Sequence, residues 1–270
     1  MKAYYRISDN SYVKEKIPGT SKEICLRNFI KHFPNTDITI IADNCTDDTI
    51  SMITSITDAK LIRTSLNNAS SFNFSLEIAM QNESDCINYF VEDDYIHRDD
   101  VENAIKEGLS KSDYITLFDH PDKYQSEYNY GEVCKVFKTD SYKWRNTIST
   151  CMTFASKTST LKKDLSTFRR NLINNHHPND HLIFKDLKEK NRTLSLPIPG
   201  LAFHTDLTYQ IQKSSVIENS VEKLVDPWVI DSIQREILDL IYVKKNIVLT
   251  PVECPNYTTL MTLDVLLKSC

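Results

Sequence analysis

INYFVEDD, residues 87–94, is the stretch that decides the expected fold. Five mostly apolar residues run directly into the carboxylates of Glu92, Asp93 and Asp94, which is typical of a short, largely buried strand. Ligands of open α/β sheets bind at the carboxyl ends of the strands. Neighbouring acids repel one another there unless positive charge compensates them, and a divalent cation with oxygen ligands is the usual solution. The stretch therefore predicts that Asp94 binds a divalent metal ion and that this ion binds a diphosphate. The alternative is that the acids begin a helix, where negative charge is also favoured.

The segments on both sides of this stretch alternate between strand and helix patterns. We expect strands at 3–7, 38–42, 60–63 and 87–91, with helices at 20–32, 46–56 and 71–81 between them. Further along we expect helices at 99–109, 158–173 and 179–189 and strands at 114–118, 133–137, 151–155 and 194–198. Beyond these we expect helices at about 215–225, 227–242 and 260–268 and a strand at 247–249. Strands that alternate with helices in this way predict a doubly wound, parallel sheet.

Composition excludes several classes of protein. The chain has 270 residues, a net charge of −5 and 26% charged residues, which is ordinary for a globular protein and disfavours general nucleic-acid binding. No apolar run approaches 18 residues and the N-terminus lacks the apolar core of a signal peptide, so we expect neither a transmembrane segment nor export. Seven cysteines without a CxxC pattern fit a reducing compartment, and hence a cytoplasmic location. Only four glycines are present, and neither GxGxxG nor a Walker A motif occurs.

A polar turn follows the second expected strand. The turn DNCTDDT, residues 43–49, lies at the carboxyl end of that strand and faces the same crevice as the acids. The Asp43 carboxylate can accept hydrogen bonds there from a nucleobase or a ribose hydroxyl. The alternative is an ordinary capped helix start, which Asp47, Asp48 and Thr49 suit equally well.

Three motifs together resemble the GT-A nucleotide-sugar glycosyltransferases of the family-2 type. IADNCTDDT is similar to their vDDgStDgT segment, NFSLEIA (73–79) to their N-x-G-x-x-x-A helix start, and YFVEDD (89–94) to their flDaDD, or DXD, motif. The order and spacing of the three also agree with that family. The chain departs from the pattern at Ala42, Cys45 and Ser75, which replace Asp, Ser and Gly. The chain also resembles the small GT-A enzymes encoded by large DNA viruses, which would place it in a host cytoplasm.

The resemblance implies a fold and an activity. The fold would be α/β, a GT-A (Rossmann-like) mixed, mostly parallel sheet flanked by helices. Residues 1–210 would form this domain, with 1–120 as the nucleotide-sugar-binding half and 121–210 as the acceptor half, and 211–270 would be a helical C-terminal extension. The activity would be metal-dependent transfer of a sugar from a nucleoside-diphosphate donor to a glycan or other hydroxyl acceptor. The first candidate for the donor is a UDP-sugar, and the transfer would invert the anomeric centre by direct displacement.

Two other functions remain open. A sugar nucleotidyltransferase can use a related sheet and metal, but it usually carries a Gly-rich loop with a basic residue near the first strand, which we do not find in the sequence. A non-catalytic nucleotide- or glycan-binding module would keep the fold without the chemistry. The oligomeric state is not predicted.

The resemblance also assigns donor contacts. Asp43 would contact the base, and Arg6 and Arg63, at the ends of the first and third strands, would reach base, ribose or phosphate. Ser71, at the start of the third helix, would add a further donor contact. Arginine pairs well with phosphate oxygens, and the alternative for each arginine is a surface ion pair.

The acids and a late histidine would complete the donor site. Glu92 or Asp93 would touch the ribose or the donor sugar, and Asp94 would ligate Mn²⁺ or Mg²⁺. His204 follows a turn and a short apolar run, where many GT-A enzymes place an additional metal ligand. His97, close after the acids, is a further candidate neighbour of the metal.

A second constellation is HHPNDH, residues 176–181. Pro178 suits a helix start, so Asp180 is expected in the first helical turn, where the helix dipole keeps a carboxylate ionised. An ionised carboxylate can take the proton of an acceptor hydroxyl as its oxygen attacks the sugar. The resemblance supports Asp180 as this catalytic base. Tyr128, Tyr130 and Trp144 could stack on acceptor sugar rings, the alternative being that they belong to the core.

Overall fold

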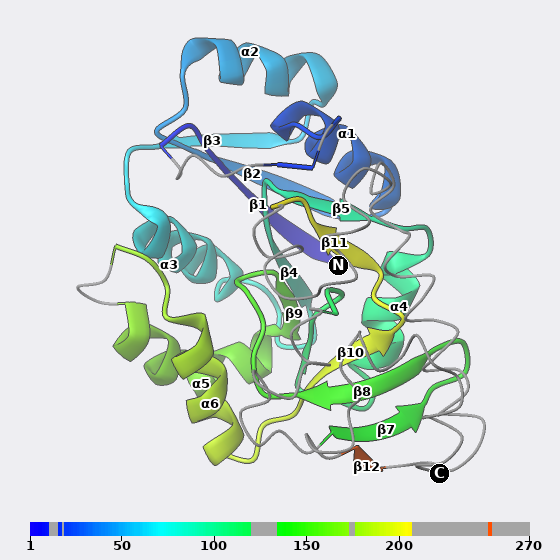
Figure 1. Ribbon diagram of the computed structural model, residues 1–270. Coiled ribbons are helices and arrows are strands. Elements are labelled where there is room, and N and C mark those ends of the chain that lie inside the picture. The colour runs from blue at the N-terminus through cyan, green and yellow to red at the C-terminus, as the bar shows by residue number, and fades with distance from the viewer. Residues whose placement is uncertain (11–15, 18, 120–133, 173–175, 207–247, 250–270) are drawn as a thin grey trace.

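A ten-stranded mixed sheet runs through the computed structural model of the protein (Figure 1). The structure describes residues 1–10, 16, 17, 19–119, 134–172, 176–206, 248 and 249. The strands are β1 (Lys2–Ser8), β2 (Asp37–Asp43), β3 (Lys60–Thr64), β4 (Ile87–Glu92), β5 (Tyr95–His97), β6 (Tyr114–Ile115), β7 (Cys134–Lys138), β8 (Lys143–Thr147), β9 (Phe154–Lys157), β10 (Leu194–Ile198), β11 (Ala202–His204) and β12 (Val248–Leu249). The helices are α1 (Lys22–His32), α2 (Asp47–Ile56), α3 (Asn68–Ala79), α4 (Val101–Gly108), α5 (Thr158–Leu172) and α6 (Asp180–Glu189).

The order of the strands confirms the expected fold class. The large sheet has the order β12-β7-β8-β10-β6-β9-β4-β1-β2-β3, and its strands β4, β1, β2 and β3 are mutually parallel neighbours. Strands β8, β9 and β12 run against the direction of the other seven. The protein is therefore a mixed α/β protein with a large, mostly parallel sheet, and the carboxyl ends of β1, β2 and β4 meet at one edge.

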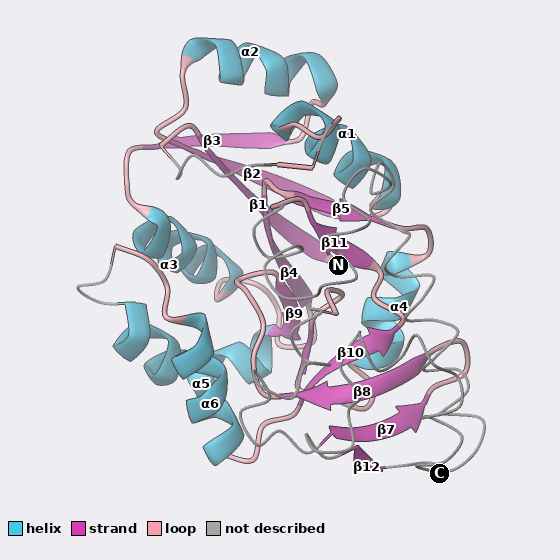
Figure 2. Cartoon of the chain, viewed as in Figure 1, coloured by secondary structure: helices cyan, strands magenta, loops and turns pink. Residues whose placement is uncertain are grey.

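Helices cover both faces of this sheet (Figure 2). Side chains of β1 alternate between the two faces, so Tyr5 packs with Phe29 of α1 on one side while Tyr4 packs with Phe72 of α3 and Phe168 of α5 on the other. Both tyrosine side chains are fully buried. Because β1 is covered on both faces, its sequence AYYRI is almost continuously apolar, as expected for a central parallel strand.

Side-chain caps set the starts of the helices that border the sheet edge. Ser21 accepts a hydrogen bond from the Ile24 N–H and begins α1 where the sequence predicts it. Helix α3 begins at Asn68, earlier than the expected residue 71, because the Asn67 side chain accepts a hydrogen bond from the Ser70 N–H at 2.8 Å. The N-terminus of α3 thus points toward the carboxyl ends of the strands.

Three strands, β5, β8 and β11, were not expected from the sequence. Strand β8 has the largely polar sequence KWRNT, which shows little strand pattern. Strand β11 pairs antiparallel with β5 in a separate two-stranded sheet, in which His204 lies opposite Tyr95. The alternative in which the acids 92–94 begin a helix is wrong, since β5 follows them and α4 begins only at Val101.

Several expectations lie outside the described residues. They are the helices of the C-terminal extension (215–225, 227–242 and 260–268) and the expected boundary between residues 210 and 211. The expected strand near 247–249 is present as β12, which pairs with β7. Among the described helices, none combines the length and the apolar character that crossing a bilayer requires.

His97 lies in the core, which corrects the expectation that it neighbours a metal at Asp94. Its Nε2 lies 2.7 Å from the Tyr89 hydroxyl, and its ring packs edge-on against Phe33 with the centroids 5.2 Å apart. Burial lowers the pKa of the imidazole to about 3, with a smaller contribution from the charge of His32. The neutral ring therefore belongs to the packing of α1 against β4.

This burial predicts a loss of stability in mild acid. Between about pH 6.5 and pH 3 the unfolded chain binds a proton at His97 that the folded protein does not, so stability is full above pH 6.5 and falls as the pH falls. At pH 5 the loss due to this residue is about 2 kcal/mol. Urea unfolding of wild type and His97→Gln at pH 7.5 and pH 5 measures it, and the variant should lose less stability between the two. The exposed His176→Gln is the matched control and should follow wild type; equal losses in wild type and His97→Gln would contradict the prediction.

Candidate functional site

A cavity of about 580 Å³ opens at the carboxyl ends of β1, β2 and β4. Its walls come from these strand ends, from the segment that enters α1, from the start of α3 and from residues just before α6. This is the place where open α/β sheets bind ligands. The lining includes six of the residues singled out from the sequence: Arg6, Asp43, Ser71, Glu92, Asp93 and Asp94.

Arg6 forms the floor of the cavity. It lies directly opposite Glu92 in the register of β1 and β4, and its Nη2 donates to the Glu92 carboxylate at 2.8 Å. Its Nη1 donates to the Asn68 side chain at 2.7 Å and to the Ser71 hydroxyl at 3.3 Å, and its guanidinium lies over the Phe72 ring. Only 6% of Arg6 is exposed. One side chain thus joins β1, β4 and α3, and it brings together three of the predicted donor-binding residues.

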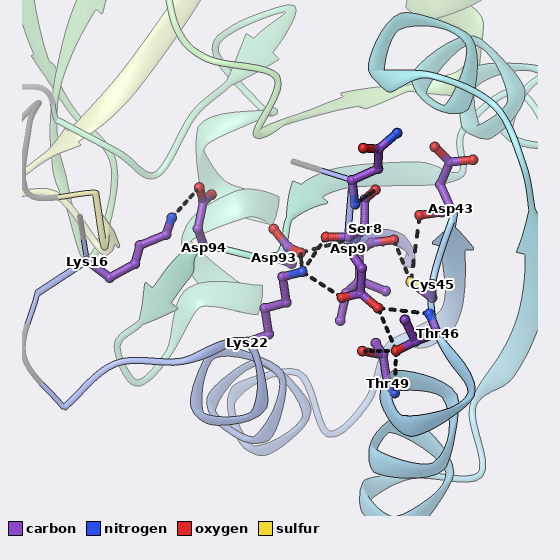
Figure 3. Close-up of polar contacts among 12 residues, drawn as sticks. Ser8, Asp9, Lys16, Lys22, Asp43, Cys45, Thr46, Thr49, Asp93 and Asp94 are labelled. Carbon is purple, nitrogen blue, oxygen red and sulfur yellow. Dashed lines mark hydrogen bonds and ion pairs between the residues drawn. The ribbon is translucent and has the colours of Figure 1, made fainter. Parts of the chain in front are cut away.

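Lys22, the first residue of α1, reaches the second acid (Figure 3). Its ammonium lies 2.8 Å from Asp9 and 3.9 Å from Asp93, and it donates a very short hydrogen bond to the Ser8 carbonyl. The Ser8 N–H also donates to Asp93, at 3.2 Å. Burial, followed by the charge of Asp94, raises the pKa of the Asp93 carboxyl, while Lys22 acts in the opposite direction.

Lys16 reaches the third acid from the opposite side (Figure 3). Its ammonium lies 2.9 Å from Asp94 Oδ2, and the His204 Nε2 lies 3.4 Å from the same oxygen. The backbone of Asp94 is fixed as well, because its carbonyl accepts hydrogen bonds from the N–H and the hydroxyl of Thr205. The structure therefore does bring together Asp94 and His204, the two predicted metal ligands, but with an ammonium beside them.

The residues around Asp94 do not fit a divalent cation in this arrangement. Lys16 donates to one of the two Asp94 carboxylate oxygens, and near a protein surface two unit charges about 4 Å apart repel by about 4 kcal/mol, with a dication doubling the repulsion. The His204 Nδ1 accepts a hydrogen bond from the Asp206 N–H, so the neutral ring carries its proton on Nε2, the nitrogen that faces Asp94. Within the described ranges, no group of three or more His, Cys, Asp or Glu residues could hold a metal ion. Mn²⁺ or Mg²⁺ at this site stays a prediction.

Asp43 lines the cavity but is engaged with its own surroundings. One carboxylate oxygen accepts hydrogen bonds from the Thr64 hydroxyl at 2.8 Å and the Leu66 N–H at 2.6 Å, and the other accepts from the Asn44 side chain. These bonds fix the connection from β3 to α3, which forms one wall of the cavity. Contact between Asp43 and a nucleobase stays a prediction.

Two expected contributors lie elsewhere. Arg63 forms an exposed ion pair with Asp47 at 2.9 Å, which is the alternative given for it and corrects its assignment as a donor contact. Trp144 is fully buried against Phe137, and its indole N–H donates to Thr139, so it belongs to the core and not to a glycan cleft. Tyr128 and Tyr130 lie outside the described residues.

Asp180 is the first residue of α6, as the sequence predicts. Asn179 caps the helix by accepting the Leu182 N–H, and Asp180 itself accepts the His181 N–H at 2.7 Å. After burial, the charges of Asp180 and Glu92 are the largest causes that raise the pKa of the Cys151 thiol, so both carboxylates lie near that residue. Asp180 is not among the residues that line the cavity, and its role as the catalytic base stays a prediction.

Sequence reasoning missed the two lysines and Asn68. Nothing in the local pattern around Lys16 or Lys22 shows that their side chains fold back onto the acids, because that contact spans about 70 residues of chain. The available signal was indirect: the three acids needed positive charge, and the expected loop between the first strand and the first helix leaves the sheet at the edge where the acids lie.

The two arginines provide a matched test of the geometry. Arg6→Met removes the guanidinium from the half-buried Glu92 and should lower the free energy of unfolding by about 2–3 kcal/mol. Arg63→Met removes an exposed ion pair and should change it by less than about 1 kcal/mol. Urea unfolding of the two variants beside wild type is the measurement. A similar loss in both would mean that Arg6 is not the fixed floor of the cavity.

The comparisons with known proteins identify no family. No family model matches the chain, and no curated protein matches it significantly. Among solved structures, a galactosyltransferase LgtC in complex with donor and acceptor sugar analogues has a TM-score of 0.42 at 10% identity over 73% of each chain. CMP:2-keto-3-deoxy-manno-octonic acid synthetase complexed with CTP has a TM-score of 0.45 at 11% identity over 82% of this chain and 96% of its own. TarS (residues 1–349) of S. aureus has a TM-score of 0.41 at 15% identity over 73% of this chain and 58% of its own. None of these likenesses places the chain in a family, and none supports the viral type.

Proposed function

We propose that this protein transfers a sugar from a nucleoside-diphosphate donor, with a UDP-sugar as the first candidate, to a hydroxyl group of a glycan or another acceptor. One observation carries the proposal: Arg6, Lys16 and Lys22 meet three carboxylates in a single cavity at the carboxyl ends of parallel strands. A volume of about 580 Å³ suits a ligand of this size. Side chains of Asn67, Asn68 and Ser71 add neutral hydrogen-bonding groups of the kind that bases and ribose require.

The proposed chemistry is a direct displacement. The acceptor oxygen forms a bond to the anomeric carbon while the bond from that carbon to the diphosphate oxygen breaks, and the electron pair leaves with the diphosphate. Asp180 takes the proton of the acceptor hydroxyl, since the N-terminus of α6 favours its ionised form. Negative charge that develops on the diphosphate faces the ammonium groups at the cavity wall. The cavity aligns donor and acceptor for this one step.

Nucleotidyl transfer is the second candidate, and one observation favours it. Lys16 and Lys22 follow the first strand and line the cavity, so basic residues do lie near the first strand, where nucleotidyltransferases carry one. The chain still has no Gly-rich loop at that place. A nucleotidyltransferase would bind a nucleoside triphosphate, whereas a glycosyltransferase releases a diphosphate, and this difference separates the two. A binding module without chemistry would bind a nucleotide but turn none over.

Calorimetric titration tests the donor class. We expect one of UDP, GDP, CDP and dTDP to bind with a Kd between about 1 μM and 1 mM, the usual range for enzyme substrates, and more tightly than its triphosphate. Arg6→Met should weaken this binding, while Arg63→Met should leave it as in wild type. Tighter binding of a triphosphate would favour the nucleotidyltransferase, and absence of binding by every nucleotide, with and without Mn²⁺, would refute both enzymatic proposals.

Replacing the proposed base separates chemistry from binding. Asp180→Asn should lower the rate of nucleoside-diphosphate release from the donor sugar by about 10²–10⁴-fold while the affinity for the diphosphate stays unchanged. Asp48→Asn is the matched control, because it removes an equivalent first-turn charge from α2, away from the cavity. An Asp180→Asn variant with the turnover of wild type would remove Asp180 from the mechanism.

A further inference from the structure

The position of Lys16 is fixed by backbone contacts and not only by its side chain. Lys16 forms an antiparallel bridge with Asp206, and the Ile17 N–H donates to the Thr205 carbonyl at 2.9 Å. The Thr205 N–H in turn donates to the Asp94 carbonyl at 2.8 Å. Lys16 and Asp94 are thus held by the same short segment, which follows β11. The backbone therefore places the two residues side by side, and their side chains meet at 2.9 Å.

The Lys16 ammonium also faces the ligand space. Lys16 and Asp94 both line the cavity, and about a third of the Lys16 side chain remains exposed, compared with 14% for Asp94. An ammonium can donate up to three hydrogen bonds, so a donor to Asp94 can bind a phosphate oxygen as well. A divalent cation between a carboxylate and a diphosphate likewise binds both groups at once.

We propose that the Lys16 ammonium takes the place of the divalent cation at Asp94, so that the protein holds the diphosphate of its donor without a metal. The proposal rests on the proposed function for the identity of the ligand. Its basis is the disagreement between an acidic motif that resembles a metal site and an arrangement in which each acid already lies beside a cation of the chain. The three ion pairs are separate contacts: Arg6 with Glu92, Lys22 with Asp93 and Lys16 with Asp94. Of the three cations, Lys16 is the one bound to the acid expected to hold the metal.

Nucleotide titrations in EDTA and in Mn²⁺ test the proposal on the full chain. UDP, GDP, CDP and dTDP are the probes. Wild type should bind its nucleotide with the same Kd, within about twofold, in EDTA and in Mn²⁺. Lys16→Met keeps the length of the side chain and removes its charge, so it should bind at least about tenfold more weakly in EDTA and recover in Mn²⁺. Lys16→Arg should bind in EDTA. Lys2→Met, which removes a lysine paired with Asp37 at the surface, should behave as wild type.

The outcomes are distinct. If wild type loses nucleotide binding in EDTA and regains it with Mn²⁺, the proposal is overturned while the proposed function is supported. This comparison uses wild type alone and does not depend on the folding of a variant. Unchanged binding by Lys16→Met in EDTA also overturns it.

Mn²⁺ alone provides a readout that does not depend on a nucleotide. Binding followed by electron paramagnetic resonance should be at least about tenfold tighter in Lys16→Met than in wild type, because the charge of Asp94 then lacks the ammonium. Adding Asp94→Asn to Lys16→Met should abolish the gain. Equal Mn²⁺ affinity in wild type and Lys16→Met would overturn the proposal, whether or not a nucleotide binds. Absence of nucleotide binding, in contrast, is the result that would refute the proposed function.

Discussion

Compensation of three consecutive carboxylates is the constraint on which the site depends. Glu92, Asp93 and Asp94 end a strand that is buried on both faces, and a buried or half-buried carboxylate is costly unless it is paired. Each acid receives a cation from the first 22 residues of the chain. The N-terminal segment is therefore both the central strand of the sheet and the source of the positive charge at its edge.

The topology makes this compensation possible. Because β1 lies between β4 and β2, the parallel register places Arg6 directly beside Glu92 without any loop contribution. The chain then leaves β1 at the same edge and enters α1 at Lys22, so the start of that helix lies over the acids. Lys16 comes from the connection between the two, and its backbone pairs with the segment after β11. A break in that pairing would separate the ammonium from Asp94 although both residues remained in place along the chain.

Local pattern was sufficient for most of the fold but not for the charges of the site. The apolar run before Glu92 and the alternation of strands and helices specify a buried parallel sheet, and the motif order places the acids at its edge. Polar strand β8 was missed because burial by tertiary contacts overrides weak intrinsic strand preference. Lys16 was missed because its partner lies 78 residues away, and Arg63 was misassigned because the end of a strand does not decide toward which neighbour a long, exposed side chain turns.

Ion pairs within the chain change what the site requires of its ligand. A cluster of uncompensated acids attracts a cation first and an anionic ligand only through that cation. Here the cations that face the acids belong to the chain. An anionic ligand would share these cations with the acids, since Arg6, Lys16 and Lys22 each already contact a carboxylate. Selectivity for a nucleotide must then rest on shared donors and on neutral groups such as Asn67 and Asn68, whose positions follow from the cap that begins α3. The cap of one helix and the register of two strands thus decide together what the cavity can bind.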